Sequence, residues 1–194
     1  MTKLIFKMIL IFTVFFSVEA KSKEVGIGDV NSKVTIKVFS SLTCPACANF
    51  HSKIFYQIKE EFIDKGLVRF EHHPFPLDLA ALNAEIIVRC HVDNSKKFEL
   101  LGKIYEKQKL WAVGSDINKI NNSIKKIGLD SDLKNKDMDN CLKDENKQDE
   151  ILNQRIDAQK KYEIESTPTI FINEKKYKGK VEYKEFKKVL EKNL

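Results

Sequence analysis

The feature that most restricts the fold is a pair of cysteines, Cys44 and Cys47, at the junction between a strand pattern and a helix pattern. Residues 34–39 (VTIKVF) are β-branched, aromatic and largely apolar, which is typical of a buried strand. Apolar residues then recur at helical spacing over 44–63, and a second strand pattern follows at 67–72. The segment therefore predicts a βαβ unit with parallel strands and with both cysteines at the start of its helix.

The start of a helix is a position that changes thiol chemistry. Thr43 offers an N-cap, and Pro45 suits a first helical turn because its missing N–H costs nothing there. Unpaired amides at this end favour an anion, which lowers a thiol pKa and supplies the reactive thiolate. We therefore expect Cys44 to be the exposed attacking sulfur and Cys47, one turn deeper, to be the buried resolving thiol.

A Cys-x-x-Cys pair alone is ambiguous, because such a pair also ligates zinc or an iron–sulfur cluster. The remaining cysteines, Cys90 and Cys141, form no second Cys-x-x-Cys pair, and the histidines at 72–73 complete no familiar zinc spacing. A dithiol–disulfide site at 44–47 is therefore favoured over a metal site.

The first residues have the pattern of a secretory signal. Lys3 and Lys7 are followed by an apolar run over 8–18, and Ala20 ends a segment of small and medium residues. We expect cleavage after Ala20 and export, the alternative being an uncleaved membrane anchor. In an oxidising compartment four cysteines suggest two disulfides, with three connectivities open.

The rest of the chain favours a soluble globular protein. Hydrophobic residues make up 42% and charged residues 32%, and the net charge of +6 comes from lysines scattered among glutamates. Such a pattern indicates a solvated surface and argues against nucleic-acid binding. Helical patterns fill the region 77–162, and the expected helix over 145–161 places Ile151 and Ile156 on its inner face. A short strand at 169–172, a turn and a final amphipathic helix follow.

Three segments, VFSSLTCPAC, RFEHHPFPL and STPTIFINEKKYKG, together resemble the DsbA-like branch of the thioredoxin superfamily. The resemblance covers about 23–194. It implies an α/β fold, a thioredoxin fold with an inserted helical domain. The expected divisions are a signal peptide at 1–20, a thioredoxin-like domain at 21–76 and 163–194, and a helical insert at 77–162.

The resemblance also implies roles for individual residues. Cys44 and Cys47 are the expected catalytic pair around the dipeptide Pro45-Ala46. Pro168 occupies the position of a cis-proline that faces the active disulfide, and Thr167 before it is expected to contact substrate backbone. Cys90 and Cys141 are expected to form a structural disulfide within the insert, as in some alphaproteobacterial members. The family implies neither a metal nor a cofactor.

The activity that the resemblance implies is thiol:disulfide exchange in the periplasm. The expected partners are reduced or unfolded exported proteins and a membrane quinone-linked reductase of DsbB type, and a monomer is expected. The alternatives are a disulfide isomerase or reductase of the same superfamily, which usually carries an N-terminal dimerisation region, and a metal-binding structural protein.

Two departures from the family pattern affect the expected oxidising strength of the cysteine pair. Related proteins often bury an acidic residue on the first strand as a proton acceptor, but here that position is Val38, so no buried carboxylate is assigned. The dipeptide is Pro-Ala, whereas the strongest oxidants carry Pro-His, which predicts a milder oxidant. His51 is expected on the surface, and His72 and His73 are expected as structural turn residues.

Overall fold

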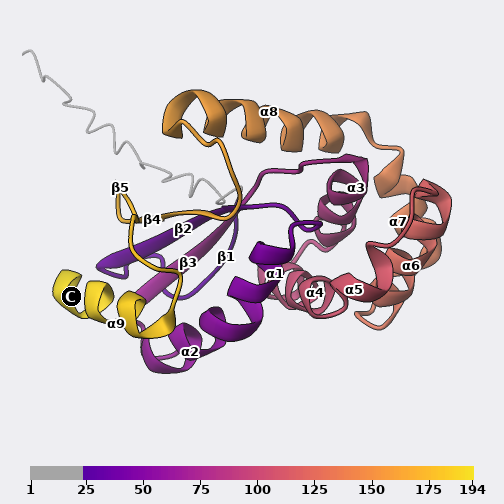
Figure 1. Ribbon diagram of the computed structural model, residues 1–194. Helices are drawn as coiled ribbons and strands as arrows, with labels where there is room; N and C mark the ends of the chain where they lie inside the picture. Colours follow the sequence, from indigo (N-terminus) through magenta and orange to yellow (C-terminus); the bar gives the residue numbers. More distant parts are fainter. Residues whose placement is uncertain (1–23) are drawn as a thin grey trace, which may run out of the picture.

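The protein is described by a computed structural model over residues 24–194, and the expected signal peptide lies outside the described residues. A five-stranded sheet with order β1-β3-β2-β4-β5 forms its centre (Figure 1). The strands are β1 (Val25–Ile27), β2 (Val34–Ser40), β3 (Val68–Pro74), β4 (Thr169–Ile172) and β5 (Lys175–Lys176). The parallel pairing of β2 with β3 confirms the predicted βαβ unit, while the other three pairs are antiparallel.

Strand β1 was not predicted, because its three residues read as a short polar lead-in. It pairs with β3 over Val25↔His72 to Ile27↔Phe70. A Cβ at Gly26 would lie 2.8 Å from Phe70 O, so the small residue permits close approach of the two strands. A three-residue strand containing glycine carries almost no periodic signal.

The helix that follows the cysteine pair is continuous, as predicted, but it contains wide turns. It consists of α1 (Pro45–Phe50), a π-helical turn (His51–Phe55), α2 (Tyr56–Ile58) and a second π-helical turn (Lys59–Ile63). Its apolar face packs on the sheet through Phe50, Phe55 and Ile58, each at most 2% exposed. Apolar spacing predicts helical structure but does not distinguish α from π turns.

The insert consists of helices, as predicted. They are α3 (Leu79–Val88), α4 (Asn94–Glu106), α5 (Gln108–Trp111), α6 (Ile117–Leu129), α7 (Asn135–Leu142) and α8 (Glu145–Tyr162). Aspartates cap four of these helices by accepting backbone N–H groups: Asp78, Asp93, Asp116 and Asp144. The prediction for α8 was wrong at Ile156, which is 45% exposed, whereas Ile151 is fully buried.

Helices cover both faces of the sheet (Figure 1). On one face the side chains of Val34, Ile36 and Val38 pack against the helix after the cysteines, α4 and α9 (Tyr183–Asn193). On the other face Phe39 and Phe171 pack beneath α8. The alternating side chains of β2 therefore serve two separate cores. Within residues 24–194, no helix is long and apolar enough to cross a membrane.

Candidate active site

Cys44 begins α1 at the end of β2. It is the N-cap residue itself, and its Sγ accepts a hydrogen bond from Cys47 N at 3.4 Å. The expected capping residue, Thr43, instead donates its hydroxyl to Asp78 Oδ2 at 2.8 Å. The sulfur therefore lies directly at the positive end of the helix.

The two thiols have opposite electrostatic environments. A hydrogen bond from the Cys47 thiol lowers the pKa of Cys44 to about 5, assisted by bonds from Thr167 and from the backbone N–H groups of Cys47 and Ala46 against the opposing effect of burial. Burial raises the pKa of Cys47 far above its ordinary value, and its contact with Cys44 adds to the increase. Cys44 is therefore the thiolate of the reduced pair at neutral pH.

Cys44 is more exposed than Cys47, as predicted, but Cys44 itself is less exposed to solvent than expected. Cys44 is 8% exposed and Cys47 is 2% exposed. The expectation that Cys44 is an exposed sulfur was thus wrong in degree, because the segment around Thr167 covers it. Any reagent must therefore reach the Cys44 sulfur through a small opening, and Cys47 is closed to it.

Thr167 and Pro168 lie against the cysteine pair. The peptide bond between them is cis, and the Cys44 thiol lies 3.3 Å from Thr167 O. Thr169 holds this turn by donating its hydroxyl to Ser166 O at 2.7 Å. The structure thus brings together four residues from the two ends of the thioredoxin-like fold: Cys44, Cys47, Thr167 and Pro168.

The helical insert supplies a side chain that sequence reasoning missed. Gln108, at the start of α5, donates from Nε2 to Leu42 O at 2.7 Å and to Cys44 O at 3.0 Å. It is 6% exposed, so both bonds are shielded from water. Gln108 therefore fixes the loop that carries Cys44. A lone glutamine between two lysines gives no sequence signal for this role.

A buried carboxylate also lies below the site, although none was assigned from the sequence. Glu85 on α3 is fully buried and lies 2.5 Å from His72 Nε2, while His72 Nδ1 lies 3.0 Å from Ser40 Oγ. The expected carboxylate position at Val38 is apolar, and the acid comes from the insert instead. A single glutamate within the apolar run LAALNAEIIV was the available signal.

The histidine predictions need correction. His51 is 4% exposed rather than on the surface, stacks on Phe55 and Tyr105, and burial lowers its pKa to about 3. His72 lies in β3, as the strand pattern at 67–72 predicted, and His73 continues that strand rather than belonging to a turn. The strand continues to Pro74 because prolines are tolerated at strand ends.

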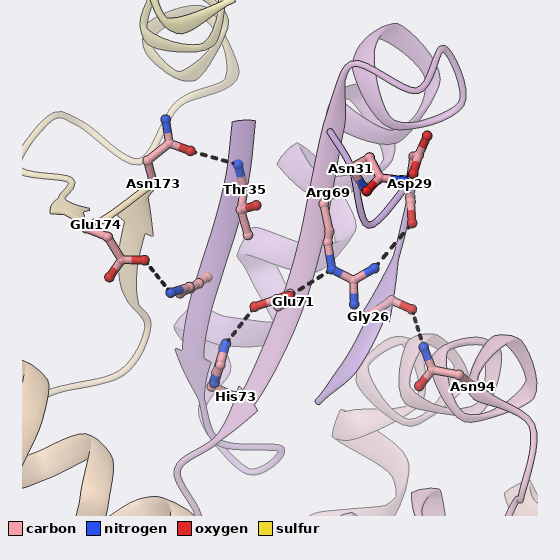
Figure 2. Close-up of polar contacts among 12 residues, drawn as sticks. Gly26, Asp29, Asn31, Thr35, Arg69, Glu71, His73, Asn94, Asn173 and Glu174 are labelled. Atoms are coloured by element: carbon pink, nitrogen blue, oxygen red, sulfur yellow. Dashed lines mark hydrogen bonds and ion pairs between the residues drawn. The ribbon is translucent and has the colours of Figure 1, made fainter. Parts of the chain in front are cut away.

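His72 and His73 point to opposite faces of the sheet, as successive strand residues do. On the face opposite the cysteines, Glu71 lies between two nitrogen donors, 2.7 Å from Arg69 Nε and 3.3 Å from His73 Nε2 (Figure 2). These hydrogen bonds lower the pKa of Glu71 to about 2. Lys37 on the same face pairs with Glu174 at 2.6 Å. This face is a separate polar layer.

Cys90 and Cys141 form a disulfide. It joins the chain just after α3 to α7, with the two Cα atoms 6.0 Å apart. Both cysteines lie within the helical insert, at a distance along the chain from the 44–47 pair. Among residues 24–194, no group of three or more His, Cys, Asp or Glu side chains is placed to hold a metal ion.

A thioredoxin fold with two thiols of opposite pKa shift beside a Thr-Pro turn defines a thiol:disulfide oxidoreductase. The family model described as "Thioredoxin" matches residues 20–192. Disulfide bond formation protein D of Bacillus subtilis is 32% identical over 177 residues, which cover 87% of this chain and 76% of that protein. The chain belongs to the DsbA-like thiol:disulfide oxidoreductases of the thioredoxin family.

Other known proteins agree with this assignment. A putative protein-disulfide oxidoreductase of Rickettsia bellii is 26% identical over 84% of this chain, which spans only 61% of that relative. The crystal structure of Wolbachia pipientis alpha-DsbA1 superposes with a TM-score of 0.80 at 27% identity, covering 88% of this chain and 90% of that one. Oxidised BdbD from Bacillus subtilis gives 0.72 at 25% identity, covering 88% and 92%.

Proposed function

We propose that this protein introduces disulfides into exported proteins in the periplasm through its Cys44-Pro45-Ala46-Cys47 site. The observation that carries the proposal is the lowered pKa of Cys44, about 5. A stabilised thiolate favours the reduced form of the enzyme, and an enzyme whose reduced form is stabilised is an oxidant toward its clients. The direction of exchange follows from this asymmetry.

In the proposed reaction a client thiolate attacks Cys44 Sγ of the Cys44–Cys47 disulfide. The bond between the cysteines breaks, a mixed disulfide forms on Cys44, and Cys47 leaves as a thiolate that must gain a proton. A second client thiolate then attacks the client sulfur, and Cys44 leaves as the stabilised thiolate. The client gains a disulfide, and the enzyme holds two more electrons and two reduced sulfurs.

We assign Thr167 and Pro168 to client binding. Thr167 O lies 3.3 Å from Cys44 Sγ, so a chain seated on this sulfur must contact that backbone. An extended client segment that pairs with exposed backbone would use strand-addition recognition. In this division of the chain, residues 21–76 and 163–194 carry the redox site, and the insert at 77–162 supports it from behind, stapled by Cys90–Cys141.

The proposed setting follows from the N-terminal sequence and the family. Residues 1–20 carry the pattern of a cleavable signal, which directs the protein to the periplasm. Reoxidation of the reduced cysteines requires an electron acceptor, and we propose a membrane partner of DsbB type. The enzyme is proposed to act as a monomer.

The reduction potential of the Cys44–Cys47 pair, measured by equilibration with glutathione, tests the direction of exchange. We expect a value between the roughly −120 mV of DsbA and the roughly −270 mV of thioredoxin. A potential below about −250 mV would refute the oxidase assignment. The control is the Cys90→Ala/Cys141→Ala double variant, which isolates the active pair from the second disulfide.

Client assays separate an oxidase from an isomerase. With reduced ribonuclease the oxidised enzyme should form disulfides at stoichiometric turnover, whereas scrambled ribonuclease should regain little activity. A protein that rescues scrambled ribonuclease efficiently and elutes as a dimer would instead be an isomerase. Stoichiometric zinc bound through Cys44 and Cys47 would contradict a redox role altogether.

A further inference from the structure

A chain of four polar side chains lies in the core directly beneath the active cysteines. Tyr105 donates its hydroxyl to Ser40 Oγ at 2.9 Å, Ser40 Oγ lies 3.0 Å from His72 Nδ1, and His72 Nε2 lies 2.5 Å from Glu85 Oε1. Each of the four is at most 5% exposed. Burial of this many polar groups is costly unless each is paired, so their retention in the core requires a reason.

The four residues come from four elements: α4, β2, β3 and α3 for Tyr105, Ser40, His72 and Glu85 respectively. One arrangement of protons is consistent with all three contacts of the chain, although Glu85 Oε2 has no hydrogen-bond partner among residues 24–194. His72 donates from Nε2 to the Glu85 carboxylate, which leaves Nδ1 to accept the Ser40 hydroxyl proton. Ser40 Oγ in turn accepts from Tyr105. The order of donors runs in one direction, from the tyrosine hydroxyl to the carboxylate.

The chain reaches the resolving cysteine through a small cavity. Cys47, Ser40, His72 and Tyr105 all line this cavity, whose volume is about 10 Å³. That volume is at the lower limit for one water molecule, and His51, whose Nε2 has no hydrogen-bond partner in the described part of the chain, is among the residues that line the cavity. Cys47 is otherwise enclosed and 2% exposed, so bulk water does not reach its sulfur directly.

Cys47 needs a proton acceptor or donor in every cycle. As a thiol it must lose its proton before it can attack a mixed disulfide on Cys44, and as a leaving group it must gain one. Burial opposes its ionisation by raising its pKa. The thiol–disulfide step therefore stalls at a closed sulfur unless a proton path reaches it.

We propose that Ser40, His72 and Glu85 form a proton path that serves Cys47 and couples the helical insert to the chemistry of the cysteine pair. When Cys47 attacks the Cys44 mixed disulfide, its proton passes across the cavity to Ser40, as the Ser40 proton moves to His72 Nδ1. The Cys47 sulfur forms the new bond to Cys44 Sγ, and the client leaves as a thiolate. Reduction of the disulfide runs the same transfers in reverse.

The surrounding groups fit this assignment. Arg89 Nε lies 3.9 Å from Glu85 Oε2, which places a cation behind the carboxylate at the far end of the path. His51 on the first π-helical turn lines the same cavity, but burial and the nearby His72 keep it neutral by lowering its pKa to about 3. Tyr105 stays protonated because burial raises its pKa, so it acts as a fixed donor to Ser40.

Stopped-flow reaction of the reduced full-length mature protein with the thiol reagent DTNB separates the two steps. Attack by Cys44 releases one thionitrobenzoate, and attack by Cys47 on the resulting mixed disulfide releases a second. The variants are Ser40→Ala and Glu85→Gln. The matched control is Glu71→Gln, the same substitution at a carboxylate that also contacts a β3 histidine, but on the opposite face of the sheet (Figure 2).

We expect both variants to slow the second release about 100-fold near pH 7. The first release should stay within about twofold of wild type in both, and Glu71→Gln should change neither step. In wild type, D₂O should slow only the second release. A merely structural role would slow both steps together or lower the melting temperature without separating them.

The proposal is overturned if Ser40→Ala and Glu85→Gln keep the second release at the wild-type rate across the pH range, or if both releases slow equally. If Glu85→Gln does not fold, Ser40→Ala decides, because it removes a single hydroxyl and little volume. The isotope measurement on wild type needs no variant: equal second-step rates in H₂O and D₂O contradict a transfer through this path. Failure here leaves the oxidase assignment intact, since that rests on the reduction potential.

Discussion

The lowered pKa of Cys44 predicts a reversal of reactivity between acid and alkaline pH. Near pH 5.5 a pKa of about 5 leaves about three-quarters of Cys44 as thiolate. An unstructured cysteine peptide, with a pKa of about 8.5, has only about 0.1% thiolate there. Thiolates of low pKa are weaker nucleophiles, and a Brønsted slope of about 0.45 over about 3.5 units costs Cys44 about 40-fold. The net advantage of Cys44 near pH 5.5 is therefore about 20-fold.

At alkaline pH the same numbers favour the peptide. Near pH 8 about a quarter of the peptide is already thiolate, so the weaker nucleophilicity of Cys44 dominates and it reacts about 10-fold more slowly. The two rates should cross near about pH 7. Rates of attack on DTNB, measured in parallel for protein and peptide, test this, because the pH dependence of the reagent cancels in the ratio.

Two outcomes would refute the reasoning. A protein-to-peptide ratio below one near pH 5.5 would show that Cys44 is no low-pKa thiol. An unchanged inflection in Cys47→Ala would also contradict the structure, since the Cys47 thiol makes the largest contribution to lowering the pKa of Cys44. We expect that variant to move the inflection of Cys44 to higher pH.

Three further predictions concern stability. Cys90→Ala/Cys141→Ala, which opens a loop between cysteines 51 positions apart, should lower the free energy of unfolding in urea by about 4 kcal/mol, and a loss below about 1 kcal/mol would contradict it. Gln108→Leu leaves the carbonyls of Leu42 and Cys44 without their donor, and should lower the free energy of unfolding by about 1–3 kcal/mol and change the rate at which the active pair is oxidised. If neither the stability nor the oxidation rate changes, the glutamine is dispensable. Gly28→Ala should lower the melting temperature by several degrees, because φ is +99° there and the new Cβ would lie 2.5 Å from Val68 O. An unchanged melting temperature would show that the backbone adjusts to the Cβ without cost.

The elements predicted from the sequence are those whose apolar residues recur with the period of a strand or a helix. The strand over 34–39 and the helical spacing after Cys44 fix the βαβ unit, and the parallel pairing of β2 with β3 confirms it. Strand β1 was missed because its pairing with β3 depends on close approach at Gly26, which is a tertiary property. Ile156 was misplaced because residues five positions apart on an α-helix point about 140° apart, so the face that buries Ile151 leaves Ile156 toward solvent.

In the candidate site, the prediction succeeded for features set by neighbouring residues in the sequence and failed for contacts between distant segments. The helix start determines the reactivity of Cys44, so its role follows from four consecutive residues. Burial of His51 was missed because Tyr105, on which it stacks, comes from α4 of the insert, whereas Phe55 lies on the same π-helical turn. Glu85 was missed because the family pattern places the acid on the strand before the cysteines, whereas here the acid reaches the same region from α3 of the insert.

The insert thus approaches the cysteine pair from two directions. Gln108 holds the carbonyl of Cys44 from one side, and Glu85 acts through His72 below Cys47 on the other. Each contact acts on one of the two cysteines. Gln108 fixes the loop of the attacking Cys44, and Glu85 belongs to the proposed path for the proton of the resolving Cys47. The helix start alone therefore gives a reactive Cys44, whereas the proposed path for the Cys47 proton ends on a carboxylate that the insert supplies.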